Sequence, residues 1–439
     1  MAVTPDESLG AEQREAVEFM LRLGRALNQS GYPADSLKEL LGAVSLRLGL
    51  PHVEVYNTAT GLQLAFGPLS RQRTYLMAVA PGNLDLSKMT GLDRVALRVM
   101  EGRLTVAEGI ERVERIEAAA SPYGPIPTAL AYALASGAFA QLFGGGLREI
   151  TLAVVIGGLT GLLALVAARS HRAEDLLGPV AAFLSAFIAA AVAARAMQIS
   201  SSIVTLAGLV ILLPGLTLTI ALEELSTRHL VTGVSRLSAA LITFLGIVFG
   251  VAMGSQIAQI SFGPAHSAAP IPLPPWASLA AVGVSVLAIT VILRAQPRDI
   301  GWVAVGVAIA YGASSLGALA LGPLGAFLGA LALGLASNLF SILRNRPALL
   351  MQAPGLFILV PGSIGYLGLA ALLQSNTLSG VQAAFQMFLI GAALVYGLLF
   401  ANLISPDRTL RRIVERVARH KPQKPMNAPA HEPGAAEGD

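Results

Sequence analysis

Residues 199–222 read ISSSIVTLAGLVILLPGLTLTIAL, a run of 24 residues without a charged side chain. A bilayer core of ~30 Å needs ~20 apolar residues in a helix, so this run has the length and composition of a membrane span. Pro214 and Gly215 interrupt it past its middle. Proline removes an amide donor and clashes with the preceding helical turn. The run therefore predicts a membrane helix that is broken within the bilayer.

The same scarcity of charge extends far to both sides of this run. Between Ile126 and Ser405 there is no Lys, and the sixteen Arg, Asp and Glu residues gather in short clusters. A charge at the centre of a bilayer costs at least ~2.5 kcal/mol on insertion scales, so the apolar stretches between clusters are predicted spans. We expect about ten, at 126–146, 149–168, 176–194, 199–222, 236–258, 276–294, 300–320, 322–342, 348–373 and 380–404.

Arginines are distributed unevenly between the predicted loops. Eight fall in loops on the side of the N-terminus, and only Arg148 and Arg195 fall on the opposite side. Cytoplasmic loops carry the excess of positive charge, so both termini are predicted to be cytoplasmic. Acidic residues such as Asp6 and Glu7 stand where a signal peptide would need basic and apolar residues, which argues against one.

Residues 1–125 have the mixed composition of a soluble domain, with 13 basic and 15 acidic side chains. Apolar spacing predicts helices at 12–28, 35–48, 92–101 and 105–119, and strands at 52–56, 62–66 and 73–79. Thr105 and Glu108 form a predicted capping box. We expect a cytosolic α+β domain over 1–125. Residues 406–439 predict an amphipathic helix on the lipid surface followed by a disordered tail.

The membrane part contains an internal repeat. Leu-Pro-Gly at 213–215 recurs as Val-Pro-Gly at 360–362, an offset of 147 residues that also relates Val248 to Val395 and Gly250 to Gly397. Each half, 126–262 and 263–405, would hold five spans, and an odd number forces the second copy upside down, as in many secondary transporters. The alternative is chance similarity between helices rich in Gly, Ala and Leu. The fold class is thus an all-α polytopic membrane protein of two inverted five-helix repeats, with the α+β domain before them.

Sequence signatures of soluble enzymes are absent. There is no phosphate-binding loop, GxGxxG, GxSxG or HExxH motif, and there is no cysteine. The six histidines are scattered, so no metal or other cofactor is predicted. No clustered basic face suits a nucleic acid. We therefore expect a transporter and not an enzyme, although a membrane-anchored hydrolase built on residues 1–125 remains an alternative.

The two Pro-Gly breaks are the predicted substrate-binding site. A broken membrane helix exposes backbone groups that are tolerated only in protein or a watery cavity, and its new N-terminus favours a carboxylate. A simple packing kink is the alternative reading of each break. The predicted binding residues are Pro214, Gly215, Thr217, Thr219, Pro361, Gly362, Ser363 and Tyr366. Coupling or gating is predicted for Glu149, Glu223, Glu224, Asp299, Arg148, Arg195 and Arg298, for which interfacial flanking is the alternative.

These segments resemble the threonine/serine exporter family. The resemblance rests on Leu-Leu-Pro-Gly-Leu-Thr-Leu-Thr at 212–219, on Gly-Val-Ser-Arg at 233–236 and on Val-Pro-Gly-Ser-Ile-Gly-Tyr at 360–366. Leu-Gly-Arg-Ala-Leu at 23–27 and Val-Ala-Pro-Gly-Asn at 79–83 look like that family's cytosolic domain. In some members the two halves are separate chains, and this chain looks like the fused form. It departs from the family at Ile220, where the family often has Asn, and at Glu224, where it often has Asp.

The resemblance implies export of small hydroxy amino acids, threonine and serine, driven by the proton motive force through alternating access. It implies a multi-pass protein of a bacterial plasma (inner) membrane whose partners are the substrate, protons and the lipid bilayer, and it allows a homo-oligomer. The family is also associated with dicarboxylate export, so a succinate-like substrate is the alternative. The scarcity of cations along the predicted pathway disfavours that alternative.

Overall fold

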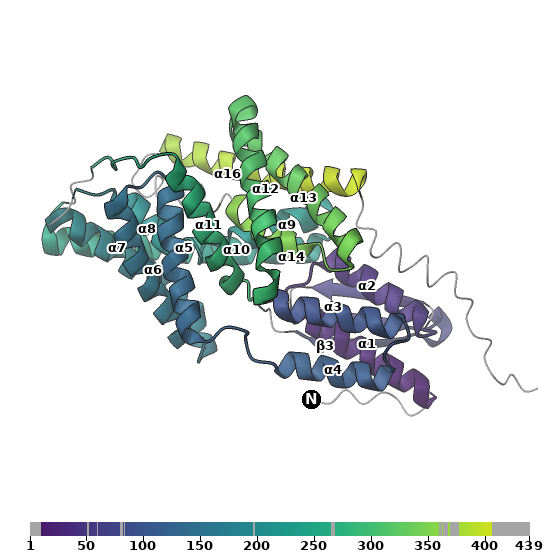
Figure 1. Cartoon of the computed structure of the whole chain (residues 1–439). Helices are drawn as coiled ribbons and strands as arrows, with labels where there is room; N and C mark the ends of the chain where they lie inside the picture. Colours follow the sequence, from purple (N-terminus) through teal and green to yellow (C-terminus); the bar gives the residue numbers. More distant parts are fainter. Residues whose placement is uncertain are drawn as a thin grey trace, which may run out of the picture.

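A computed structural model describes residues 10–405, apart from 51, 59, 80–81, 83, 196–197, 265–267, 360–361, 363–367 and 369–376. The chain forms an N-terminal part of helices and strands, and a larger part made of helices that extends away from it (Figure 1). The amphipathic helix and disordered tail predicted for 406–439 lie outside the described residues.

The N-terminal part contains every helix and strand predicted for it. Its α3 starts earlier than expected, at Leu86, because the side chain of Asp85 caps the helix by accepting a hydrogen bond from the backbone N–H of Lys88 at 2.9 Å. The capping box of Thr105 and Glu108 is confirmed at the start of α4. The elements are α1 (Ala11–Gln29), α2 (Ala34–Arg47), β1 (Val53–Thr58), β2 (Gly61–Phe66), β3 (Arg73–Ala78), α3 (Leu86–Met100) and α4 (Val106–Ala118).

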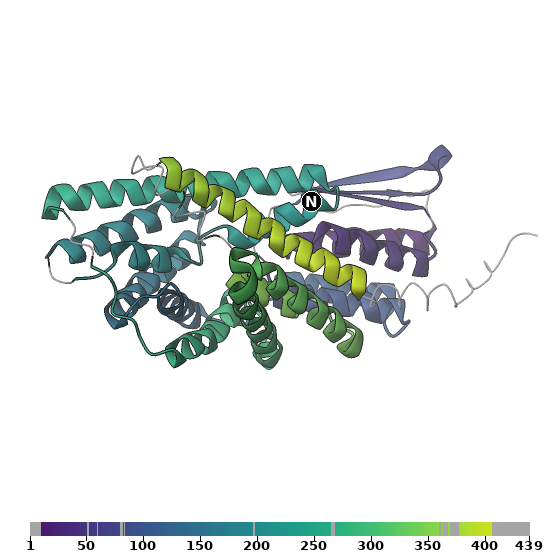
Figure 2. The same ribbon diagram turned by 90° about the horizontal axis from the view of Figure 1, so that it is seen from above.

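The three strands form one antiparallel sheet in the order β1-β2-β3. Leu62 and Leu64 alternate along the central strand and are both fully buried. Helix α1 lies directly on this face, since a Cβ added to Gly24 would meet the side chain of Leu62. The strands form a layer beside the helices (Figure 2). Full burial of such a leucine stabilises the fold by about 1.5–3 kcal/mol, so this alternation fixes the register of the sheet.

The rest of the described chain is helical. Five of its helical segments are long and apolar enough to cross a membrane: Leu147–Ala167, Arg172–Arg195, Leu230–Phe262, Pro297–Arg344 and Leu378–Ile404. This supports a polytopic membrane protein, and the number of ten spans stays a prediction. The helices are α5 (Pro125–Leu142), α6 (Leu147–Ala167), α7 (His171–Arg195), α8 (Ser201–Leu209), α9 (Gly215–Ser226), α10 (Leu230–Phe262), α11 (Trp276–Ile292), α12 (Ile300–Leu321), α13 (Gly325–Arg344), α14 (Leu349–Leu359) and α16 (Thr377–Ile404).

The same pairs of helices pack together in both halves of the membrane part. In the first half α5 packs on α6, α6 and α7 both pack on α8, and α7 packs on α10. In the second half α11 packs on α12, α12 and α13 both pack on α14, and α13 packs on α16. These helices correspond in order along the chain, so the packing agrees with the predicted repeat without establishing its inversion.

Two glycines at the predicted repeat offset occupy matching close crossings. A Cβ added to Gly250 on α10 would meet the carbonyl oxygen of Pro179 on α7. A Cβ added to Gly397 on α16 would likewise meet the carbonyl oxygen of Phe327 on α13. Small residues let membrane helices approach this closely. The third and fifth helices of each half therefore cross at the same place along the repeat.

The N-terminal part is docked against several loops of the membrane part. The backbone N–H of Leu86 donates to the carbonyl of Leu293 at 3.0 Å, and Tyr123 donates from its hydroxyl to the carbonyl of Ala295 at 2.7 Å. Helices α2 and α3 lie beside α14 and the end of α13 (Figure 1). These loops are among those expected to share one side of the membrane with the N-terminus.

Candidate functional site

The predicted helix break between α8 and α9 is present. Helix α8 ends at Leu209 and α9 begins at Gly215, with turn and bend residues between them. Pro214 is the residue before α9 and has no N–H of its own, while the N–H of Gly215 donates to the carbonyl of Leu213 at 2.8 Å. Among the described residues, the amides of Leu216 and Thr217 have no acceptor outside the helix. The start of α9 therefore offers N–H groups to a ligand.

The two predicted threonines lie in the first turns of α9. The hydroxyl of Thr219 is fully buried and donates to the carbonyl of Gly215 at 3.2 Å, so it remains able to accept a hydrogen bond. Thr217 is half-buried, and its hydroxyl has no partner among the described residues. The two side chains thus place polar groups next to the backbone break.

The break lies inside the protein, between the two halves of the membrane part. Leu213 and Leu218 belong to a core that also contains Met387 of α16. Leu216, two residues after Pro214, packs against the same core as Leu359, which stands two residues before the second Pro-Gly segment. The first break therefore packs against α14 and α16 of the second half.

A cavity of about 1080 Å³ lies where the end of α9 meets the N-terminal part. Its walls come from α2 and α3 on one side and from α9, α13, α14 and α16 on the other. No Lys or Arg of the described residues lines it, and His52 is its only basic lining residue. Five carboxylic acids line it: Asp35, Glu39, Asp93, Glu223 and Glu224. The cavity is therefore strongly acidic and suits a ligand that carries a positive charge.

Glu224 is a buried acid whose carboxylate makes no hydrogen bond among the described residues. It is 4% exposed, and neither carboxylate oxygen has a hydrogen-bond partner among the described residues. Nε of Arg236 lies 3.2 Å from one of these oxygens, which is an ion-pair distance, but Nε also lacks a hydrogen-bond acceptor. The contact is therefore an ion pair without a hydrogen bond. A buried carboxylate in this state is costly, which is a common property of functional groups.

The two neighbouring acids at the end of α9 have raised pKa values. Burial raises the pKa of Glu223 to about 7, and the negative charges of Asp35 and Glu224 act in the same direction. Burial also raises the pKa of Glu224 to about 7, although Arg236 opposes this shift. Both groups lie beyond residue 222, the predicted end of the span. Each carboxyl is therefore able to gain or lose a proton near neutral pH.

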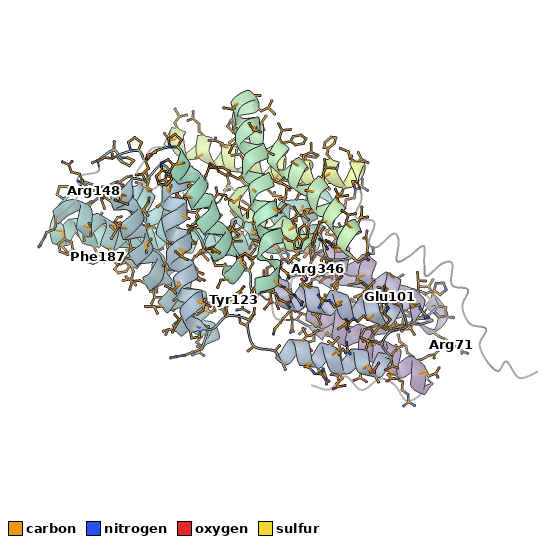
Figure 3. The ribbon with its side chains drawn as sticks, viewed as in Figure 1. Arg71, Glu101, Tyr123, Arg148, Phe187 and Arg346 are labelled. Atoms are coloured by element: carbon orange, nitrogen blue, oxygen red, sulfur yellow. The ribbon has the colours of Figure 1, made fainter. Side chains whose placement is uncertain are left out.

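Arg148 and Glu149 lie at the end of the membrane part that is far from the N-terminal part, where Arg148 is exposed (Figure 3). Glu149 is 2% exposed, and its carboxylate accepts from the backbone N–H of Gly146 at 2.9 Å and of Ser200 at 3.0 Å. It therefore caps α6 and joins it to the residue before α8. Arg195 is also on this side of the predicted topology, with its guanidinium 4.9 Å above the ring of Phe262.

Asp299 has the corresponding position in the second half. It is 2% exposed and accepts two hydrogen bonds from the guanidinium of Arg346, at 2.5 and 3.2 Å. Asp299 precedes α12 and Arg346 precedes α14, so this pair joins the same two helices of its half as Glu149 does in the first. Arg298 is exposed beside it. Figure 3 places Arg346 at the boundary with the N-terminal part, opposite to Arg148.

Of the second predicted break, the structure describes Gly362. Pro361, Ser363 and Tyr366 lie outside the described residues. Gly362 is described, and it is helical and buried. The predicted roles of all four residues stay predictions.

Comparison with known proteins agrees with this architecture. The family described as "Putative threonine/serine exporter" matches residues 18–258, and the one described as "Threonine/Serine exporter, ThrE" matches residues 278–404. The chain belongs to the threonine/serine exporter family. The first match contains the break and the acids of α9, and the second contains Gly362. The resemblance inferred from the sequence motifs is thereby confirmed, including the fused form with both halves in one chain.

Individual relatives show how far the likeness extends. The chain is 28% identical over 409 residues to the threonine/serine exporter of Corynebacterium glutamicum, covering 89% of this chain and 82% of the relative. It is 26% identical over 383 residues to a probable threonine/serine exporter of Mycobacterium tuberculosis, covering 80% and 72%. Pheromone-regulated membrane protein 10 of Saccharomyces cerevisiae is 26% identical over 376 residues, which cover 83% of this chain and 48% of the relative. No solved structure matches the chain.

Several residues of the site in this family member escaped the sequence reasoning. Asp35 and Asp93 lie in the N-terminal part, and their distance along the chain from α9 gives no signal that they share a cavity with it. Asn338 is buried on α13 and donates to the side chain of Asn402 at 2.8 Å, where both line the cavity. Of the residues that line this cavity, the sequence pattern of charge could indicate only the acid pair of α9, Glu223 and Glu224.

Proposed function

We propose that this protein exports small hydroxy amino acids, threonine and serine, from the cytoplasm by alternating access coupled to protons. The observation that carries the proposal is the acidic cavity at the end of α9, whose wall contains the buried carboxylate of Glu224, with an ion pair to Arg236 but no hydrogen bond. Membership of the threonine/serine exporter family supports the same substrate class. The cavity would be the chamber into which substrate enters from the cytoplasm.

The chemistry of the chamber favours an amino acid over a dicarboxylate. A zwitterion presents an ammonium group that the carboxylates of Glu223 and Glu224 would attract, whereas a dicarboxylate would meet like charge on the walls. Beyond the chamber, the amides at the start of α9 would bind the substrate's carboxylate. Thr217 and Thr219 would hydrogen-bond its hydroxyl. In this arrangement the substrate's ammonium group is attracted to the C-terminal end of α9 first, and its carboxylate binds at the N-terminal end of α9 later in transport.

The packing of the membrane part supports alternating access. Two halves with matched helix pairs and matched glycine crossings are what an inverted repeat would produce, and such repeats move against one another around a central site. The break in α9 lies between the halves. We propose that rocking of the halves exposes this break to each side of the membrane in turn, with the N-terminal part on the cytoplasmic side of a bacterial plasma membrane.

Protons would couple through the two acids of α9. With pKa values near 7, Glu223 and Glu224 would be protonated or ionised according to the side that the chamber faces. Protonation would weaken the hold on the ammonium group of the substrate. A proton entering from outside would therefore replace the substrate, which gives exchange of one for the other.

The test is transport in proteoliposomes that contain the purified protein. We expect exchange of labelled serine and threonine, accelerated by a pH gradient, and no exchange of labelled succinate. Gly215→Leu should abolish exchange because it fills the break, whereas Gly283→Leu, at a glycine with open space around it, should exchange normally. Succinate exchange without amino-acid exchange would establish the dicarboxylate alternative, and would refute the assignment of the chamber.

The remaining alternative is a membrane-anchored hydrolase. Two of the three relatives named above are described as exporters, and this favours transport over catalysis. Hydrolysis of a serine-containing dipeptide by the detergent-solubilised protein, in the absence of any transport, would reverse that preference.

A further inference from the structure

A second cleft, separate from the acidic chamber, lies where the loop after α13 meets α3. It has a volume of about 400 Å³ and is lined by one glutamate, Glu101, against five arginines: Arg94, Arg98, Arg103, Arg344 and Arg346. Arginines expected to face the cytoplasm are common in membrane proteins, but here two parts of the chain bring theirs to one cleft. The positive charge that the cleft offers to an anion depends on how many of these arginines are paired with acids of the protein.

Two of the five arginines have acidic partners. Arg103 lies 3.2 Å from Glu101, and Arg346 binds Asp299 through both of its terminal nitrogens. Arg344 is instead stacked over the ring of Trp302 at 5.1 Å, a contact that leaves its charge uncompensated.

The remaining two arginines have no acidic partner among the described residues. Arg94 and Arg98 both lie on α3 in the N-terminal part. Burial lowers the pKa of Arg94, and the positive charges of Arg298, Arg346 and Arg98 lower it further. At Arg94 the repulsion from the other arginines outweighs the attraction to Asp299. An anion bound in the cleft would reduce this repulsion.

The surroundings of the cleft point to a membrane lipid. Leu339 and Leu343, on the last turns of α13 before Arg344, are 53% and 70% exposed and lie on a helical segment able to cross a membrane. The aromatic ring of Trp302 lies beside the same helix end, as expected near a membrane interface. A ligand in this cleft could therefore place acyl chains along the exposed leucines and its charge among the arginines.

We propose that this cleft binds the phosphate headgroup of an anionic phospholipid and so joins the N-terminal part to the membrane helices. The planar guanidinium groups of Arg94, Arg98 and Arg344 suit a phosphate, which accepts paired hydrogen bonds. Basic pockets beside the cytoplasmic ends of membrane helices bind anionic headgroups in this way. The lipid would neutralise charges that come from both parts of the chain, and this inference does not depend on the transported substrate.

The test compares the full-length protein in nanodiscs of phosphatidylcholine with nanodiscs that also contain phosphatidylglycerol. We expect phosphatidylglycerol to raise the temperature of thermal unfolding and to be retained on the protein in native mass spectrometry. Arg94→Gln with Arg98→Gln should weaken retention about twenty-five-fold, since each cation near anionic lipid changes binding about fivefold. Arg71→Gln with Arg112→Gln removes the same charge away from the cleft and should change nothing; Arg71 lies at the far end of the N-terminal part (Figure 3).

Further measurements distinguish a lipid headgroup from free phosphate and provide a second variant in case the first does not fold. Millimolar inorganic phosphate added to phosphatidylcholine nanodiscs should give no stabilisation, and stabilisation equal to that by phosphatidylglycerol would overturn the lipid assignment. If the double variant does not fold, Arg98→Gln alone changes one exposed side chain and should still weaken retention about fivefold. Unchanged lipid retention in these variants, or equal loss in the Arg71 and Arg112 control, would also refute the proposal.

Discussion

Glu149 and Glu224 are both almost fully buried in the membrane part, but their surroundings differ. The carboxylate of Glu149 accepts hydrogen bonds from two backbone amides, whereas the oxygens of Glu224 have no hydrogen-bond partner among the described residues. Hydrogen bonds from backbone amides offset the cost of burying a carboxylate, and a buried carboxylate without hydrogen bonds lacks this compensation. Glu149 therefore acts as a link between helices, whereas Glu224 has an ion pair with Arg236 but no hydrogen bond, in the wall of the cavity.

Asp299 falls on the same side of this comparison as Glu149. Its two bonds to Arg346 join the helices of the second half that correspond to those joined by Glu149. The sequence alone grouped Glu149, Asp299 and Glu224 as candidates for coupling or gating. Glu149 and Asp299 have hydrogen-bond partners that join helices, whereas Glu224 has none among the described residues. We therefore expect substitutions at the first two to affect stability and a substitution at Glu224 to affect transport.

The largest effect is expected when the link at Asp299 is removed. Asp299→Ala leaves the guanidinium of Arg346 buried without its partner, which typically costs about 3–5 kcal/mol. Because Arg346 retains some exposure, we expect the lower end, and a fall in the thermal unfolding midpoint of about 5 °C or more in detergent.

The control for this variant removes both charges. Asp299→Ala combined with Arg346→Met should recover much of the lost stability, since a buried ion pair replaced by apolar groups is often neutral. A single variant as stable as the wild type would show that the pair is not a structural link, and would return Asp299 to the candidates for gating.

Glu224→Gln is expected to lower transport, and because it also removes the ion-pair partner of Arg236, rates are compared at equal amounts of folded protein. The amide keeps the size of the side chain but removes the charge that attracts an ammonium group, so we expect exchange of serine to fall about a hundredfold, equivalent to about 2.7 kcal/mol. Initial rates in proteoliposomes measure this. Glu174→Gln is the matched control, because Glu174 is exposed at the start of α7 and away from the cavity lining. Equal rates in the two variants would remove Glu224 from the site.

Glu223 makes a smaller prediction that depends on pH. Its pKa is about 7 in the folded protein against an ordinary 4.5, so the folded state loses stability as the pH rises from 4.5 through 7. Glu223→Gln cannot ionise and escapes this loss. We expect the variant to be more stable than the wild type at pH 8, by about 1–2 kcal/mol after allowance for partial exposure, and equal to it at pH 4.5. Thermal unfolding at the two pH values measures the difference, and an advantage that is larger at pH 4.5 would contradict it.

The sequence predicted the local features of this fold well. Alternating leucines gave β2, the spacing of Thr105 and Glu108 gave the start of α4, and Pro214 with Gly215 gave the break between α8 and α9. Each of these depends on residues within a few positions of one another. The physical rule behind each one acts locally, so it can be read without knowing the rest of the structure.

The chamber could not be predicted in this way because its walls are distant in sequence. Asp35 and Asp93 reach the end of α9 only after the N-terminal part docks on the membrane helices. The partners that distinguish Glu149 from Glu224 are backbone amides in one case and an arginine on the next helix in the other, and neither leaves a pattern of residue types that predicts the contact. The number of spans and the inversion of the repeat stay predictions for a similar reason, since they depend on the orientation of whole helices.

The smallest effect is expected at Thr219, which tests whether the break takes part in the same pathway as the acids. Its hydroxyl donates to the carbonyl of Gly215, so Thr219→Val loses one hydrogen bond within α9 and one acceptor for the substrate. A lost neutral hydrogen bond is worth about 1 kcal/mol, so we expect a roughly fivefold fall in serine exchange. Thr219→Ser keeps the hydroxyl and should exchange normally. Equal exchange by both variants would mean that the hydroxyl of Thr219 serves only to hold the helix, and that recognition lies nearer to Glu224.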